Sequence, residues 1–297
     1  MGYRETYDAY AKKVEAALAA YFSDAVEITE PLKSAMGYSL FIGGKRLRPV
    51  LTLSANALLD GDEKEVMPIA CAMEMIHTYS LIHDDLPAMD DDDLRRGKPT
   101  NHKVFGEGMA VLAGDGLLSY AFEIMLQNAL SYPNKLACHV RAINQVASGA
   151  GVFGMVGGQC MDLYCEGSEE ATVEALAFIH KNKTGAMIVS ALLAGLLVCS
   201  PTKEQIAAVR AYGSDIGLAF QITDDILDIV GDVEKLGKNT GSDERAKKLT
   251  YPAMYGLEAA KVKVLELVVS ACGHLSLFGE KAAFLKELAV VLSRRES

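Results

Sequence analysis

The amino-acid sequence predicts an all-α protein built as a bundle of long helices. Apolar residues recur at steps of three and four wherever the chain is periodic. No stretch of strand length alternates convincingly between apolar and polar side chains. A third observation is that the run 186–199 is apolar nearly all round, which is typical of a helix that other helices surround.

Two segments show the helical period most clearly. Near the amino terminus the apolar positions are Tyr7, Tyr10, Ala11, Val14, Leu18 and Tyr21, and after residue 200 they are Ile206, Val209, Ile216, Phe220, Leu227 and Val230. Ser200, Pro201 and Thr202 precede Glu204 and Gln205, so a capping hydroxyl and a proline mark the start of the second helix.

The breaks between helices do not resemble domain linkers. They lie at 43–49, 87–102, 167–171 and 231–252, and the composition does not shift across them. We therefore expect residues 1–297 to form a single domain. The last break is long enough for a mobile lid.

Composition and charge narrow the function classes. The 297 residues are 50% apolar, and 29 basic against 39 acidic side chains give a net charge of −10. This sign argues against binding of nucleic acid or of an anionic membrane surface. The six cysteines form no Cys-x-x-Cys pair, so we expect free thiols and a cytoplasmic location.

No membrane insertion is expected from the sequence. Residues 1–5 show no charged segment leading into an apolar run, so no signal peptide is visible. The most apolar stretch, 186–199, contains Ser190 and Gly195 and is shorter than the ~18 residues that a membrane span needs. It is better interpreted as a core helix.

Carboxylates crowd the segment 81–93. Asp84 and Asp85 follow an apolar helical run, and four consecutive aspartates begin at Asp90. Pro87 disfavours helix at the preceding residue, so the helix should end near Asp85. A helix carboxyl terminus repels anions, so the placement is electrostatically unfavourable. A solvated acidic loop remains the alternative when this cluster is considered alone.

A second acidic cluster makes a metal site the better interpretation. Asp224 and Asp228 are four residues apart, on one face of a helix flanked by apolar residues. Carboxylate oxygens without histidine or cysteine select hard cations, and Mg²⁺ that also binds substrate phosphates fits best. Calcium is less suitable, because the EF-hand spacing is absent.

Three groups of basic residues accompany the acids. They are Lys45, Arg46 and Arg48 in the first break, Arg95, Arg96 and Lys98 after the first acidic cluster, and Lys238, Lys247 and Lys248 after the second. Charged runs are usually solvated surface, but in a chain of net charge −10 these groups favour polyanionic ligands.

Two other features carry little weight alone. Residues 149–154 match Gly-x-Gly-x-x-Gly, but no β-branched strand precedes them, so a dinucleotide site is not expected. The small residues up to Gly158 instead predict a close approach of two helices. His77 and His83, as lone histidines, are more often packed or capping residues than catalysts.

These motifs resemble those of the head-to-tail trans-prenyl diphosphate synthases, in particular the bacterial farnesyl diphosphate synthases. Five ordered segments carry the resemblance, 43–49, 77–103, 183–185, 220–228 and 237–252, and they span nearly the whole chain. The resemblance implies an isoprenoid-synthase-like bundle around a central cavity, a homodimer, and Mg²⁺-dependent condensation of isopentenyl diphosphate with dimethylallyl and geranyl diphosphate.

The resemblance also implies roles for single residues. Asp84 and Asp90 would be the outer aspartates of the first metal motif and Asp224 would lead the second, with Asp85 and Asp228 assisting in holding three Mg²⁺ ions. Gly44, Lys45, Arg48, His77 and Arg96 would hold isopentenyl diphosphate. Arg95, Lys183, Thr184, Gln221, Lys238 and Lys248 would face the allylic diphosphate, and Arg95, Lys183, Thr184 and Gln221 would be catalytic.

Tyr79 is the residue that should set product length. It stands five positions before Asp84, where its ring can close the cavity floor at fifteen carbons. An ordinary packed tyrosine is the other interpretation. Alternatives for the whole chain are a geranylgeranyl diphosphate synthase, a class I terpene cyclase and a non-catalytic synthase subunit. The basic motif at 45–48 counts against the cyclase, and the two intact acidic motifs count against the subunit.

Overall fold

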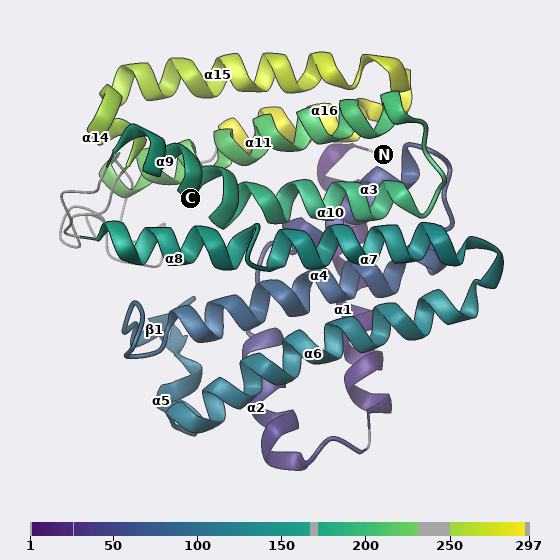
Figure 1. Ribbon diagram of the computed structural model, residues 1–297, viewed down its shortest axis with the longest axis vertical. Helices are drawn as coiled ribbons and strands as arrows, with labels where there is room; N and C mark the ends of the chain where they lie inside the picture. Colours follow the sequence, from purple (N-terminus) through teal and green to yellow (C-terminus); the bar gives the residue numbers. More distant parts are fainter. Residues whose placement is uncertain (1, 26, 167–171, 231–249, 295–297) are drawn as a thin grey trace.

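The structure is a computed structural model that describes residues 2–25, 27–166, 172–230 and 250–294. Long helices pack side by side in layers, with α15 along one edge and α2 at the opposite end (Figure 1). The amino-terminal elements are α1 (Tyr3–Asp24), α2 (Glu30–Leu40), α3 (Leu47–Ala57), α4 (Glu63–Asp84), β1 (Leu94–Arg95), β2 (Lys98–Pro99), α5 (Asn101–Phe105), α6 (Glu107–Ser131), η1 (Pro133–Lys135) and α7 (Leu136–Ala150).

The second half continues the bundle and adds one turn of π-helix, η2. Its elements are α8 (Met155–Cys165), α9 (Val173–Ile179), η2 (His180–Gly185), α10 (Ala186–Leu197), α11 (Lys203–Val230), α14 (Tyr251–Tyr255), α15 (Leu257–His274), η3 (Ser276–Ala282) and α16 (Ala283–Ser293). The predicted all-α class is confirmed. The break expected at 167–171 lies outside the described residues, as does the lid expected at 231–252 up to residue 249.

The predicted central helix is confirmed as α10. It packs against α3, α7 and α11, and its side chains are almost all buried. Glycines permit this close packing: a Cβ on Gly195 would stand 2.0 Å from the carbonyl oxygen of Thr52, and one on Gly149 would stand 2.0 Å from Oγ of Ser190. The small residues at 149–158 therefore do serve helix contact, as the sequence predicts.

Local signals set the ends of the long helices. Asp62 caps α4 by accepting a 2.9 Å hydrogen bond from the backbone N–H of Lys64, and the helix ends at Asp84, as predicted from Pro87. Thr202 and Gln205 exchange hydrogen bonds of 2.8 and 3.3 Å at the start of α11, which confirms the predicted start.

Two predicted loops differ in detail from the structure. The break 43–49 ends early, because α3 begins at Leu47 and Arg48 lies in its first turn. The break 87–102 contains the antiparallel pair β1–β2. Its two-residue turn, Arg96 and Gly97, has φ values of 54° and 74°, as a tight hairpin of this type requires.

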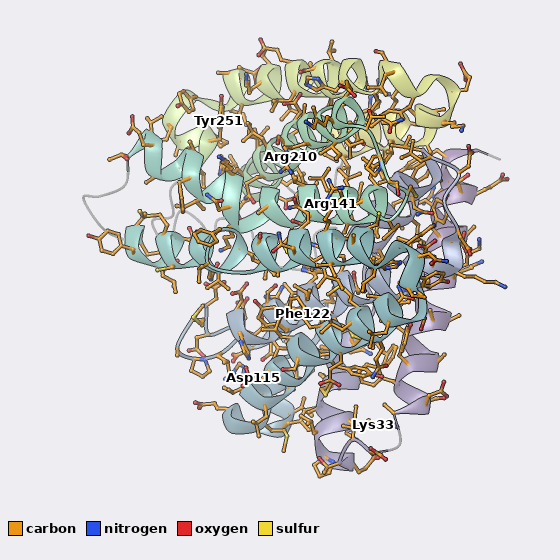
Figure 2. The ribbon with its side chains drawn as sticks, turned by 45° about the vertical axis from the view of Figure 1, so that its right-hand side comes forward. Lys33, Asp115, Phe122, Arg141, Arg210 and Tyr251 are labelled. Atoms are coloured by element: carbon orange, nitrogen blue, oxygen red, sulfur yellow. The ribbon has the colours of Figure 1, made fainter. Side chains whose placement is uncertain are left out.

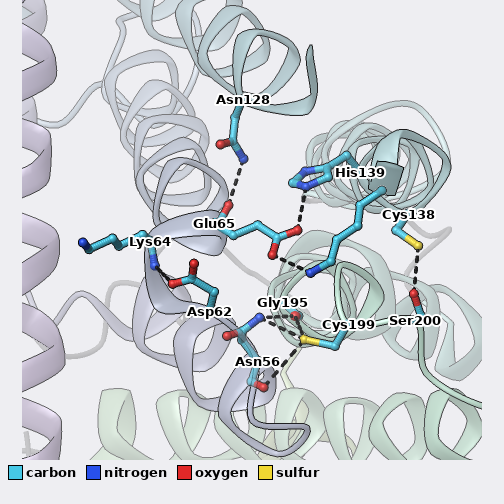
Figure 3. Close-up of polar contacts among 11 residues, drawn as sticks. Asn56, Asp62, Lys64, Glu65, Asn128, Cys138, His139, Gly195, Cys199 and Ser200 are labelled. Carbon is cyan, nitrogen blue, oxygen red and sulfur yellow. Dashed lines mark hydrogen bonds and ion pairs between the residues drawn. The ribbon is translucent and has the colours of Figure 1, made fainter. Parts of the chain in front are cut away.

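A polar cluster ties the amino-terminal end of α4 to α7 (Figure 3). The buried carboxylate of Glu65 lies 3.0 Å from Nε2 of His139 and 2.7 Å from Nζ of Lys135. Nδ2 of Asn128 donates to the carbonyl oxygen of Glu65 at 2.9 Å. At 1.5 Å per residue, this cluster lies roughly 29 Å along α4 from Asp84, so it supports the bundle away from the acidic motifs.

One described helix, α6, is long and apolar enough to cross a membrane, and α15 with the segment after it would pass only as a pair bent by 95°. Helix α6 packs along α4. The stretch that the sequence singled out, 186–199, is the buried centre of the bundle instead.

Candidate active site

The basic motif 43–49 and the β1–β2 hairpin meet at one place. Gly44 has a φ of 138°, and a Cβ there would lie 2.5 Å from Nη1 of Arg96, so only glycine fits. Arg46 adopts a φ of 51° and is buried. Its Nη1 lies 2.8 Å from Oε1 of the buried Glu74 on α4, and its Nη2 donates to the carbonyl oxygen of Leu40 at 2.8 Å. Arg46 therefore anchors the motif.

Arg48 and Arg96 form a cationic group beside this anchor, and the imidazole of His77 lies among them. Burial lowers the pKa of Arg48, and neighbouring Arg96 adds to the effect, whereas Glu74 and Asp224 oppose it. Burial, with Arg48 and Arg96, holds the pKa of His77 well below its usual range. Among the described residues, nothing accepts a hydrogen bond from the buried Nε of Arg48. Such a group suits a multiply charged anion.

A backbone hydrogen bond folds the first acidic cluster back onto the end of α4. The backbone N–H of Asp90 donates to the carbonyl oxygen of Asp84 at 2.9 Å, which brings these two aspartates together. Burial raises the pKa of Asp84 to about 6; Lys183 opposes the rise and Asp90 adds to it. Nε of Arg95 donates to both carboxylate oxygens of Asp85, at 2.7 and 2.9 Å.

Lys183 faces this cluster from the π-helical turn. Its Nζ lies 2.5 Å from Oδ2 of Asp162 on α8. Helix α8 approaches the turn so closely that a Cβ on Gly158 would stand 2.2 Å from the backbone nitrogen of Lys183. Single π turns occur frequently at functional sites. Here the turn places Lys183 close enough to Asp84 for its charge to oppose the rise in the pKa of that carboxyl group.

A hydrogen-bonded chain joins the same turn to the second acidic cluster. Oγ1 of Thr184 donates to Oε1 of Gln221 at 2.8 Å, and Nε2 of Gln221 donates to Oδ1 of Asp225 at 3.0 Å. The other oxygen of the buried Asp225 lies 3.3 Å from Nε2 of His180 and accepts the backbone N–H of Tyr251 at 2.8 Å. Asp225 therefore holds three elements together.

The structure brings most of the candidate residues to one end of the bundle. Asp84 and Lys183 interact electrostatically, as do Arg48 and Asp224, so both acidic motifs lie within reach of cations from other elements. Lys45, Asp90, Asp224 and Asp228 each have further interactions. Lys238 and Lys248 lie outside the described residues. Tyr79 is 7% exposed and its ring meets His83 edge-on at 5.7 Å.

Sequence reasoning missed three contributors. Asp162, His180 and the structural role of Asp225 become visible only when α8, η2 and α11 are packed together. A single aspartate in a helix carries no spacing signal. The pairing of Asp225 could have been suspected, because an aspartate that directly follows Asp224 must point to a different side of the helix.

Comparisons with known proteins identify the family of the chain. Residues 29–273 match the family model described as polyprenyl synthetase. The chain belongs to the polyprenyl synthetase family. Its similarity to a farnesyl diphosphate synthase from Geobacillus stearothermophilus is 48% identity over 279 residues, covering 93% of each chain. A geranylgeranyl diphosphate synthase from Cyanophora paradoxa is 46% identical over 88% of this chain and 86% of its own length.

Solved structures give the same family. A geranyltransferase from Legionella pneumophila superimposes with a TM-score of 0.88 at 36% identity, covering 99% of this chain and 97% of that one. This polyprenyl synthetase is therefore a prenyltransferase with the all-α isoprenoid synthase fold, and prenyl diphosphates suit its site. The resemblance to bacterial farnesyl diphosphate synthases drawn from the motifs is confirmed, while relatives with both fifteen-carbon and twenty-carbon names match it.

Proposed function

We propose that this prenyltransferase condenses isopentenyl diphosphate first with dimethylallyl and then with geranyl diphosphate, and releases farnesyl diphosphate. The supporting observation is that cations from separate elements face two distinct places. Arg48 and Arg96, with the neutral His77 between them, form one group, and Lys183 and Arg95 flank Asp84 and Asp85. Two diphosphates need two such groups, whereas a terpene cyclase needs only one.

The residues at the acidic motifs fit Mg²⁺. No three acidic, histidine or cysteine side chains among the described residues already converge as a metal site. Mg²⁺ is usually held by one or two carboxylates together with water and substrate phosphates, so Asp84 with Asp90, and Asp224 with Asp228, form a suitable oxygen set. We assign Asp85 an assisting role, and three ions per site remain part of the proposal. When bound, the ions would neutralise charge on the departing diphosphate.

The chain's own residues supply the rest of the chemistry. As the allylic carbon–oxygen bond breaks, the electron pair leaves with the diphosphate, and Lys183 and Arg95 stabilise that growing charge. The hydrogen bond from Thr184 to Gln221 holds the π-helical turn that carries Lys183 against the helix of the second acidic motif. Arg48 and neutral His77 hold isopentenyl diphosphate, whose alkene attacks the carbocation. The released diphosphate then takes the proton that is lost.

The packing around Tyr79 supports a fifteen-carbon product. The ring of Tyr79 lies one turn before Asp84 and packs against His83, whose Nε2 donates to the carbonyl oxygen of Val111 at 3.1 Å. A Cβ on Gly114 would stand 2.1 Å from the same nitrogen, so His83 is wedged between α4 and α6. A tyrosine supported in this way cannot easily swing aside, and it limits the length of a chain growing along α4.

The test is product analysis of the purified chain. With isopentenyl and dimethylallyl diphosphates and Mg²⁺, the dephosphorylated product should be farnesol, and Tyr79→Ala should shift it to geranylgeraniol or longer because the removed ring leaves room for a five-carbon unit. An active Tyr79→Ala enzyme that still makes only farnesol would show that other residues form the floor. Geranylgeraniol from the wild-type chain would favour the second candidate, which the 46% identity to a geranylgeranyl diphosphate synthase supports.

We also propose that the enzyme is a cytoplasmic homodimer that binds no nucleic acid. The described cysteines are all free thiols, which suits a reducing compartment. Large apolar side chains are exposed on α6, α7 and α8. Helices α7 and α8 follow one another end to end, and α6 packs beside α7 (Figure 1). Exposed apolar surface, where it is contiguous, marks interaction sites.

A further inference from the structure

A cavity lies beside the central helix α10. Its volume is about 690 Å³, and it opens between α7, α10 and α11, beside α9 and α14. Arg210 and Tyr251, both labelled in Figure 2, belong to its wall. None of the described residues assigned above to diphosphate or metal binding lines it. Within the described part of the chain, the cavity is therefore distinct from the diphosphate and metal groups described above.

The charges at this cavity favour an anion. Arg210 and Lys181 are exposed cations at its rim. The acidic residue of its wall, Asp215, has one oxygen 3.2 Å from Nε2 of His274 on α15, a pair that is ionic only when the histidine is protonated. That oxygen accepts no hydrogen bond from a described residue.

The cavity has a polar end and an apolar end. Arg210, Ser214 and Leu218 succeed one another at steps of four on one face of α11, a span of roughly 12 Å. At the first residue, Nη2 of Arg210 donates to Oε1 of Gln145 at 3.3 Å. At the last, Leu218 and Tyr251 pack on the same apolar cluster. A ligand that matches this gradient has an anionic head and an apolar body.

The buried wall of the cavity leads to the catalytic turn. His180 is 4% exposed and lines the cavity, while its Nε2 lies 3.3 Å from Oδ2 of Asp225. Asp225 accepts a hydrogen bond from Gln221, which in turn accepts one from Thr184. Together with the contact between His180 and Asp225, these hydrogen bonds connect the cavity to the residue next to Lys183. His180 and Lys183 also belong to the same π-helical turn. A ligand that moves His180 must therefore disturb the position of Thr184.

We propose that this cavity is an effector site for an amphipathic anion, whose head pairs with Arg210 and whose body lies along Leu218 and Tyr251. Occupancy changes the rate of condensation through His180. The binding claim stands on the cavity alone, whereas the effect on rate rests on the proposed prenyltransferase reaction.

The binding test uses 8-anilinonaphthalene-1-sulfonate, an anionic probe with an aromatic body that fluoresces in apolar surroundings. Titrations with Mg²⁺ and saturating inorganic diphosphate keep the diphosphate sites occupied. We expect Ser214→Phe, which fills the cavity from its exposed side, to weaken binding at least tenfold. Arg210→Ala should weaken it about tenfold by removing a charged hydrogen bond. Ser23→Phe, on the exposed surface of α1, is the matched control.

Unchanged probe affinity in Ser214→Phe would overturn the site. The coupling is tested by initial rates: the probe should change kcat at saturating substrates without competing with either one, and this effect should vanish in Ser214→Phe. Probe binding that Ser214→Phe abolishes, but that leaves kcat of the wild-type enzyme unchanged, would overturn the coupling alone. A chain without condensing activity would refute the proposed function, and the fluorescence titration would still decide whether the cavity binds anions.

Discussion

Two arginines of one motif have opposite surroundings. Arg46 pairs with the buried Glu74, whereas the buried Nε–H of Arg48 donates a hydrogen bond to none of the described residues. Removing one partner of a buried ion pair leaves an uncompensated charge, so Arg46→Ala should lower the free energy of unfolding by about 3–5 kcal/mol. Denaturant unfolding followed by circular dichroism measures this loss. A change below 1 kcal/mol would mean that water reaches Glu74 and the pair is not an anchor.

Arg48→Ala is the matched substitution for binding. The side chain makes no compensated buried pair, so the free energy of unfolding should change by less than about 1 kcal/mol. The Michaelis constant for isopentenyl diphosphate should rise roughly 10- to 100-fold, since a charged hydrogen bond contributes about 1.5–3 kcal/mol. The constant for the allylic substrate should stay within about threefold. Equal rises for both substrates would show that the two cation groups are not separate sites.

His77 gives a pH dependence whose sign follows from its surroundings. Burial, together with Arg48 and Arg96, holds the pKa of His77 well below its usual range. Below about pH 6.5 the unfolded chain therefore binds a proton at this residue, whereas the folded chain does not. Stability should therefore fall as the pH drops below 6.5, by up to about 1.4 kcal/mol per pH unit from this residue. Unfolding of His77→Asn, measured from pH 5 to pH 7.5, should show a smaller slope. An identical slope would mean that His77 is protonated normally in the fold.

At the scale of elements, the closest contact in the site is that of α8 with the π-helical turn. A Cβ on Gly158 would meet the backbone nitrogen of Lys183 at 2.2 Å, and backbone cannot move aside as a flexible side chain can. Gly158→Ala should therefore cost about 1–3 kcal/mol or more and reduce turnover, because Lys183 is displaced. Thermal unfolding and initial rates measure both effects.

Gly108→Ala is the control for that substitution. It places the same methyl group in a helix, with nothing within 4 Å of the added Cβ. It should leave turnover unchanged and stabilise the fold by up to about 1 kcal/mol through helix propensity. If both variants behave alike, the contact between α8 and the turn is looser than the structure shows.

Elements differ in how much of them the sequence could predict. Helix α11 and the end of α4 follow from local signals: apolar period, a capping box at Thr202, and Pro87. No local signal predicts the π-helical turn, because its packing partners, α8 and α11, contact it from positions far away in the sequence. Lys183 and Thr184 were found only through a family resemblance for the same reason. Asp162 and His180 were not found at all, since their partners lie 21 and 45 residues away.

At the scale of the whole molecule, the described residues include exposed apolar side chains on several helices, among them α6, α8 and α15. Leu130 on α6 is 74% exposed, Tyr164 on α8 is 64% exposed, and Val269 on α15 is 75% exposed. Helix α6 packs beside α7, which α8 continues end to end, whereas α15 runs along one edge of the bundle (Figure 1). A stable interface needs about 800 Å² from each partner, and a face of three helices offers that area more readily than a single edge helix.

We therefore expect a dimer through α6–α8. In light scattering coupled to size exclusion, the wild-type chain should have twice its 31.9 kDa mass. Leu126→Glu with Leu130→Glu should give the monomer mass, because burying two carboxylates without partners costs several kcal/mol each. Leu265→Glu with Val269→Glu, the matched pair on α15, should leave the dimer intact. Dissociation by the α15 pair alone would move the interface to that edge, and a wild-type monomer would refute the dimer on either face.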